Sequence, residues 1–95
     1  MKARYVELDV IVDELEYRCR RDGRCVLRLV LDPAKAAALA EQLGRDCFLE
    51  DLVEVEVTVE DFVYDCRRNV GCLVRMELSE REAERLRSYL ASLCL

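Results

Sequence analysis

Two stretches of the chain alternate apolar and polar residues with the period of a half-buried β-strand. Residues 6–12 carry valine or leucine at every second position, and residues 53–59 carry valine in the same pattern. The positions between are mostly acidic, which predicts one face against a core and one against water. After Val12 and again after Val59 the apolar phase shifts by one residue. We interpret the shift as a β-bulge or bend that re-aims the strand, and a short helix over residues 13–21 is the alternative.

A second alternating strand and then a helix follow each of these segments. The second strands are predicted over residues 25–31 and 72–78. Apolar residues three or four apart then form the buried stripe of a helix in each half: Ala36, Leu39, Leu43, Ala83, Leu86 and Leu90. The signals that start or stop these helices are Asp32 with Pro33, Ser79 with Glu82 as a capping box, and Gly44. Each half is therefore predicted to be a ββα unit.

An internal duplication is the strongest pattern in the sequence. Shifting the chain against itself by 47 residues aligns residues 5–48 with residues 52–95 without a gap, and 15 of the 44 aligned pairs are identical. One ββα unit cannot cover its own apolar faces, whereas two units related by a pseudo-twofold axis can. We therefore predict a single α+β domain of two repeats, with a four-stranded antiparallel sheet and both helices on one face. The opposite face would carry acidic residues, open to water or to a partner: Glu7, Asp9, Glu54 and Glu56.

Six cysteines occupy equivalent positions in the two halves: Cys19, Cys25, Cys47, Cys66, Cys72 and Cys94. A five-residue hairpin loop would set Cys19 opposite Cys25 at a distance that suits a disulfide, whereas a three-residue loop would leave them diagonal. In the second half, residues 69–71 resemble a type I turn closed by a glycine bulge, which favours the shorter loop. If each hairpin closes its own pair, Cys47 is left to pair with Cys94. Otherwise Cys19 or Cys25 could reach Cys47.

Other states of the cysteines are also open. All six could be reduced and buried as small apolar residues. A four-cysteine metal site built from both hairpins is conceivable, although zinc ligands usually stand two to four residues apart and the chain has no histidine. Thiol redox chemistry would need a reactive thiolate, and no C-x-x-C motif occurs. We predict no metal or other cofactor.

Charge is sorted along the chain. The net charge of −5 argues against nucleic acid as a bulk electrostatic partner. The two predicted hairpin tips are nevertheless rich in arginine, and these side chains are candidates for contacts with phosphates or with a partner: Arg20, Arg21, Arg24, Arg67 and Arg68. Tyr17 and Tyr64 fall on the predicted inward face, which leaves few aromatic rings for base stacking.

Composition completes these expectations. Loop-type and thermolabile residues are scarce and arginine and glutamate abundant, a pattern typical of heat-adapted proteins, in which intracellular disulfides occur. The first residues contain no apolar signal segment, so we expect a soluble cytoplasmic protein. Without histidine, a glycine-rich phosphate loop or a nucleophile motif, the sequence indicates no catalytic centre. The leading hypothesis is a small, self-associating protein-interaction module. The alternatives are a nucleic-acid-binding protein that uses the arginine-rich tips, and a thiol or metal protein.

Overall fold

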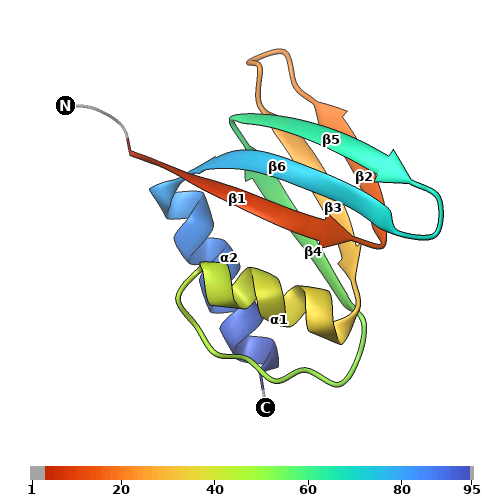
Figure 1. Cartoon of the computed structure of the whole chain (residues 1–95). Helices are drawn as coiled ribbons and strands as arrows, with labels where there is room; N and C mark the ends of the chain where they lie inside the picture. The colour runs from red at the N-terminus through yellow and green to blue at the C-terminus, as the bar shows by residue number, and fades with distance from the viewer. Residues whose placement is uncertain (1–3, 95) are drawn as a thin grey trace.

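The computed structural model describes residues 4–94, which form six strands and two helices (Figure 1). In chain order the elements are β1 Tyr5–Val12, β2 Glu14–Cys19, β3 Cys25–Leu31, α1 Pro33–Gln42, β4 Val53–Val59, β5 Asp61–Arg67, β6 Gly71–Ser79 and α2 Glu80–Leu93. The strands of this part of the chain form two antiparallel sheets, in the orders β1-β6-β5 and β2-β3-β4. Each sheet therefore combines strands from both halves of the sequence.

The predicted four-stranded sheet is wrong, and with it the ββα unit and the α+β sandwich built from two such units. Each half contributes three strands before its helix, because its long first strand is divided and the two parts join different sheets. In the first half, β1 pairs with β6, so that Val12 lies opposite Cys72, whereas β2 pairs with β3. Alternation along a strand specifies which face is buried but not which neighbour the strand pairs with, and that ambiguity produced the error.

The division of the first strand coincides with the predicted shift in apolar phase. The Asp13 N–H donates to the carbonyl of Val30 at 2.8 Å, although Val30 is already paired with Glu14. The Glu60 N–H makes the equivalent 2.8 Å bond to the carbonyl of Glu77 in the second half. Two consecutive residues thus face one residue of the partner strand, which is the arrangement of a β-bulge. The segment after the bulge is β2, and the alternative helix over residues 13–21 does not form.

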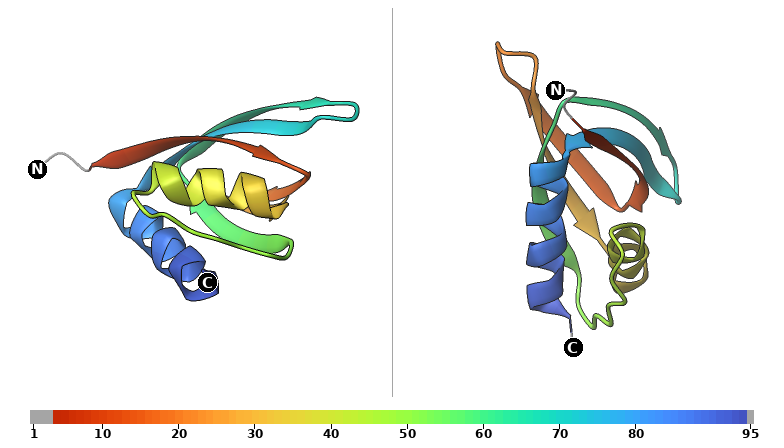
Figure 2. Two further views of the ribbon diagram at one scale, coloured as in Figure 1. Left: turned by 60° about the horizontal axis from the view of Figure 1, so that its bottom comes forward. Right: turned by 90° about the vertical axis from the view of Figure 1, so that its left-hand side faces the viewer.

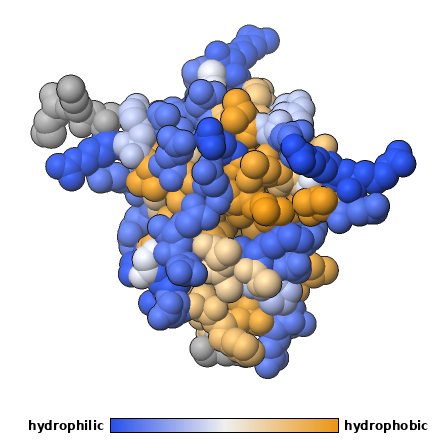
Figure 3. Space-filling model, in the orientation of Figure 1, coloured by the Kyte–Doolittle hydropathy of each residue, from blue (hydrophilic) through white to orange (hydrophobic). Residues whose placement is uncertain are grey.

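The core lies between the inner faces of the two sheets and the helices. β1 lies near β3 and β4 near β6, while α1 packs on β1 and α2 on β4 and β6. The largest side chains that are almost fully buried come from both sheets and both helices: Leu8, Leu27, Leu29, Leu31, Leu39, Met76, Leu78 and Leu90. Beyond this core two hairpins project in different directions (Figure 2). Figure 3 shows hydrophilic residues over the hairpin tips and apolar residues nearer the centre of the molecule.

Both helices begin where the sequence predicts. The Asp32 side chain accepts the Lys35 N–H at 2.8 Å, and the Ser79 hydroxyl accepts the Glu82 N–H at 3.1 Å. The capping box at the second helix is only half formed, because the Glu82 carboxylate accepts the N–H of Thr58 in β4. After α1, the N–H of Gly44 donates to the carbonyl of Glu41 at 2.9 Å and that of Arg45 to Ala40 at 3.0 Å, the two bonds of a Schellman motif.

Candidate interaction site

The outer edges of β1 and β4 are covered by side chains of the helices. On β1, the Gln42 amide accepts the Asp9 N–H at 3.1 Å and donates to the Asp9 carbonyl. On β4, the Tyr89 hydroxyl donates to the Glu54 carbonyl at 3.0 Å. The other helix side chains on β4 accept from Thr58, through Glu82, and donate to the Glu56 carbonyl, through Arg85. These bonds occupy backbone groups that another chain would otherwise use for strand pairing.

Among the described residues, no helix side chain bonds to the outer edges of β2 and β5, and on β5 the Asp61 side chain accepts the Phe62 N–H at 2.9 Å. Within residues 4–94, neither strand has a second neighbour beyond β3 and β6 respectively. Every side chain of β2 and of β5 is exposed apart from Leu15 and Phe62, which are half-buried. These two strands therefore present the two open sheet edges of the described chain.

The disulfides indicate which backbone groups point outward from these edges. Cys19 and Cys25 lie directly opposite each other with their Cα atoms 3.9 Å apart, as do Cys66 and Cys72. Such a short separation belongs to the non-hydrogen-bonded pairs of an antiparallel ladder. The next pair in the first hairpin is hydrogen-bonded, since the Arg20 N–H donates to the Arg24 carbonyl at 2.7 Å. By alternation, the outward N–H and C=O groups belong to Leu15, Tyr17 and Cys19 on β2, and to Phe62, Tyr64 and Cys66 on β5.

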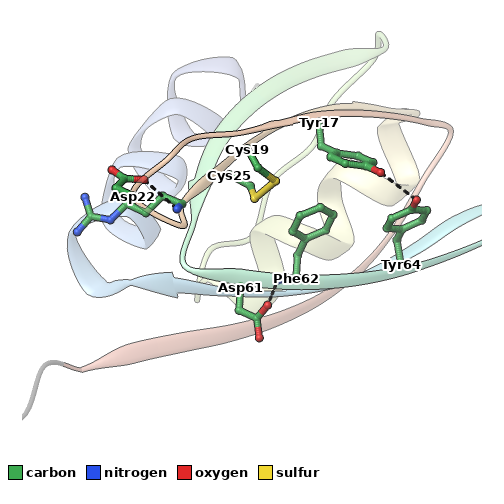
Figure 4. The surroundings of a disulfide bond; sticks show 8 residues. Tyr17, Cys19, Asp22, Cys25, Asp61, Phe62 and Tyr64 are labelled. Atoms are coloured by element: carbon green, nitrogen blue, oxygen red, sulfur yellow. Dashed lines mark hydrogen bonds between the residues drawn. A yellow bond between two sulfur atoms is a disulfide. The ribbon is translucent and has the colours of Figure 1, made fainter.

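Three aromatic rings join the open edges of the two sheets. The ring of Tyr17 lies 5.2 Å from that of Phe62 and 5.5 Å from that of Tyr64, measured between centroids. The hydroxyls of Tyr17 and Tyr64 point toward each other at 3.2 Å (Figure 4). This hydrogen bond raises the pKa of Tyr64 above its ordinary value, because it stabilises the protonated phenol. The predicted inward direction of the two tyrosines fits these contacts, yet Tyr17 is 51% and Tyr64 47% exposed.

All six cysteines are paired. Cys19 with Cys25 and Cys66 with Cys72 close the two hairpins, in the register expected for the longer loop, and Cys47 joins Cys94 across the two halves. The alternative register suggested by residues 69–71, in which the cysteines would lie diagonal to each other, does not form. Gly71 instead pairs with Arg67, and Cys72 lies directly opposite Cys66. Because all six sulfurs are in disulfides, no thiolate is left to bind a metal ion, and the alternative of six reduced, buried thiols does not apply.

The arginines of the two tips are exposed and lie apart. Arg24 pairs with Glu60 at 3.3 Å, and Arg67 pairs with Asp65 on its own strand at 3.5 Å. The remaining three form no ion pair with any residue in the range 4–94: Arg20, Arg21 and Arg68. Because the hairpins project in different directions, the tips do not form one basic surface (Figure 2).

The acidic residues do not share one face. Glu7 and Asp9 lie on the outer face of the first sheet, whereas Glu54 and Glu56 lie on the outer face of the second. A central arginine offsets the charge on each face. Arg75 approaches Asp9 at 2.9 Å and Glu7 at 3.7 Å.

On the second sheet the central arginine is Arg28, which forms an ion pair with Glu54 and lies opposite both Glu16 and Glu56. The hydrogen bond to Glu54 and the attraction of that carboxylate raise the pKa of Arg28. Arg28 and Arg75 are 47 residues apart and form an identical pair of the duplication. Their role as central charges depends on strand neighbours that the sequence left open.

The open edges themselves were missed by the sequence analysis. The sequence does contain a signal for an edge strand, which is the number of polar residues after each bend. On β2, for example, Glu14, Glu16 and Arg18 share one face.

No family model matches this chain, and no curated protein or solved structure matches it. Within residues 4–94, neither α1 nor α2 is long and apolar enough to cross a membrane.

Proposed function

We propose that the protein is a small, non-enzymatic protein-interaction module that associates with copies of itself. The observation behind this proposal is the contrast between its strand edges. The edges of β1 and β4 are bonded to helix side chains, while those of β2 and β5 are open and flanked by half-exposed tyrosines. An open edge with unpaired N–H and C=O groups is a template for strand addition by another chain.

The disulfides support an edge that is held ready for pairing. The two hairpin disulfides each join their strands beside the turn, so that the edge strand keeps its register with its neighbour. A strand held in this way loses less conformational entropy when it pairs than a free segment would lose. Together with the composition, the three disulfides also support our proposal of a cytoplasmic protein from a heat-adapted organism.

Sedimentation equilibrium of the oxidised protein tests this function. We expect the apparent mass to rise from the monomer toward the dimer between micromolar and millimolar concentration, and a parallel run in high salt measures how far charge contributes. A protein that stays monomeric at the highest concentration, and that binds no partner in its native extract, would contradict the proposal.

Nucleic-acid binding is the second candidate, and the observation that favours it is that three tip arginines, Arg20, Arg21 and Arg68, form no ion pair with the residues that the structure describes. Phosphate contacts release counterions, so the logarithm of the affinity should fall as the logarithm of the salt concentration rises. A titration of duplex and single-stranded DNA and RNA at several salt concentrations measures this slope. Absence of binding at low salt would exclude this candidate.

A further inference from the structure

The outer face of β2 carries a charge sequence that is complementary to itself. Side chains of alternate residues point away from the core: in chain order these are Glu14, Glu16 and Arg18 on β2, and Arg20 directly after the strand, where its N–H still bonds to the Arg24 carbonyl. Two acids are thus followed by two bases. When such a strand meets a second copy of itself running in the opposite direction, acids lie opposite bases along the whole contact.

We propose that two copies of the chain pair antiparallel along β2, with Tyr17 opposite Tyr17 of the second copy. This inference rests on the self-association proposed above and specifies its surface. In this register Glu16 lies opposite Arg18 of the second copy and Glu14 opposite Arg20. The twofold axis doubles each contact to give four pairs of opposite charge. The two β2-β3-β4 sheets become one continuous sheet of six strands.

The backbone of β2 meets the requirement of this register. The outward N–H and C=O groups belong to Leu15, Tyr17 and Cys19, as the cysteine pair and the Arg20 to Arg24 hydrogen bond indicate. With Tyr17 on the axis, Leu15 faces Cys19 of the second copy. Every outward group then meets an outward group, as the hydrogen-bonded pairs of an antiparallel ladder require.

Other registers of the same edge fail on charge. After a shift of one residue, each residue with outward N–H and C=O groups would face a residue of the second copy whose N–H and C=O groups already point to its own β3. The two strands could then form no ladder of hydrogen bonds. A shift by two residues keeps the pairing of outward groups but sets Glu16 opposite Glu16 or Arg18 opposite Arg18 on the twofold axis, and a shift by four sets Glu14 opposite Glu16 or Arg18 opposite Arg20. Like charges directly opposite each other are unfavourable across strands. The register centred on Tyr17 therefore has the best match of charge and backbone.

The equivalent edge of the second half does not have this property. The outer face of β5 carries Asp61, Val63, Asp65 and Arg67. Pairing about Tyr64 would set Val63 opposite Asp65, and Arg67 is already bonded to Asp65 within the chain at 3.5 Å. The β5 edge is therefore the natural control surface, since it has the same backbone geometry and a different charge sequence.

Charge exchange across β2 tests the inference. We would measure the dimer dissociation constant of the oxidised protein by sedimentation equilibrium for E16R, R18E and the double variant, with D65R on β5 as the matched control. Each single substitution places two pairs of like charges in the twofold dimer, so we expect dissociation constants at least about tenfold higher than that of the unmodified protein. The double variant restores all four opposite pairs and should return to the unmodified value, and D65R should have no effect.

Mixing the two single variants provides a second measurement. E16R has two bases at positions 16 and 18, and R18E has two acids there, so the mixture should form a heterodimer more tightly than either variant self-associates. Within the β2-β3-β4 sheet R18E sets no like charge directly across from position 18, because Arg18 lies opposite Val26, whereas E16R sets a base opposite Arg28.

The outcomes separate the two proposals. If the unmodified protein dimerises but the single variants dimerise equally well, or the double variant does not recover, or D65R weakens the dimer as much as R18E does, the β2 interface is wrong and self-association remains. If the unmodified protein is monomeric at millimolar concentration, the β2 interface and self-association both fail.

Discussion

Gly71 is the position at which a single added methyl group should reveal how the two halves are joined. This residue begins β6 with a backbone φ of +108°, beside the end of β1 where the chain bends. A Cβ atom built on Gly71 would overlap the carbonyl oxygen of Val12 and lie 3.3 Å from its carbonyl carbon. Gly23, at the tip of the first hairpin, has a φ of +90° and no atom within 4 Å of such a Cβ atom, which makes G23A the matched control.

The magnitude of each effect follows from two separate costs. A residue with a side chain loses roughly 1–2 kcal/mol in a positive-φ conformation that glycine adopts freely, and both variants incur this cost. G71A also overpacks a contact with backbone, which typically costs about 1–3 kcal/mol. The Val12 side chain is fully buried and the next N–H is bonded to Val30 at 2.8 Å, so this backbone has little freedom to retreat. We expect G23A to lose about 1–2 kcal/mol and G71A about 2–5 kcal/mol.

Urea unfolding of the oxidised proteins, followed by circular dichroism, measures both free energies under the same conditions. Unchanged m-values would establish that the unfolded states are comparable. If G71A and G23A were destabilised equally, the close approach of β6 to the end of β1 would contribute nothing to stability. The reasoning from the pairing of β1 with β6 would then be refuted.

Two further predictions concern the disulfides and one acidic side chain. Replacing Cys47 and Cys94 by alanine should cost about 2 kcal/mol more than replacing Cys19 and Cys25, because their separation in sequence is 47 residues rather than 6 and longer loops lose more entropy on closure. Equal midpoints in urea would contradict this loop-entropy argument. Burial of Glu82 opposes its ionisation, but hydrogen bonds from Arg85 and from the Thr58 N–H outweigh burial and lower the pKa of Glu82 below its ordinary 4.5. The stabilisation is therefore present above that value and lost as the pH falls through the lower pKa of the folded state, so the stability difference between the unmodified protein and E82Q should be large near neutral pH and shrink below about pH 4.5. A difference that stays constant in urea titrations across this range would show that the charge of Glu82 contributes nothing.

Local structure follows from the sequence wherever one side chain determines one geometric choice. Asp32 and Ser79 start the helices as their side-chain oxygens predict, and Gly44 follows the end of the first helix. The phase shift after Val12 marks the bulge correctly because a side chain can change face only if the backbone adds a residue.

Strand neighbours do not follow from the same patterns. β1 could pair with β3 or with β6 and bury the same valines, since both candidates are apolar on alternate positions. The choice depends on the packing of the whole core. In this core β1 pairs with β6 and β4 with β3, so that each sheet contains strands from both halves of the sequence. For the same reason the open edges could not be located: whether β2 is an edge strand depends on where β1 goes.

The two halves of the sequence differ at exposed positions of their edge strands, which a partner chain would contact. The shift of 47 residues maps the Cys19–Cys25 disulfide onto Cys66–Cys72. The same shift exchanges the two cysteines of the Cys47–Cys94 bridge and the two tyrosines whose hydroxyls meet, as expected of contacts on a pseudo-twofold axis. Residues that hold the hairpins are retained in both halves, whereas two of the four outward positions along the edge strands change in charge: Glu16 corresponds to Val63, and Arg18 to Asp65. Since exposed charges contribute little to folding stability but discriminate strongly between partners, this divergence leaves one fold with two unequal edges, of which only β2 carries the charge sequence on which the proposed pairing rests.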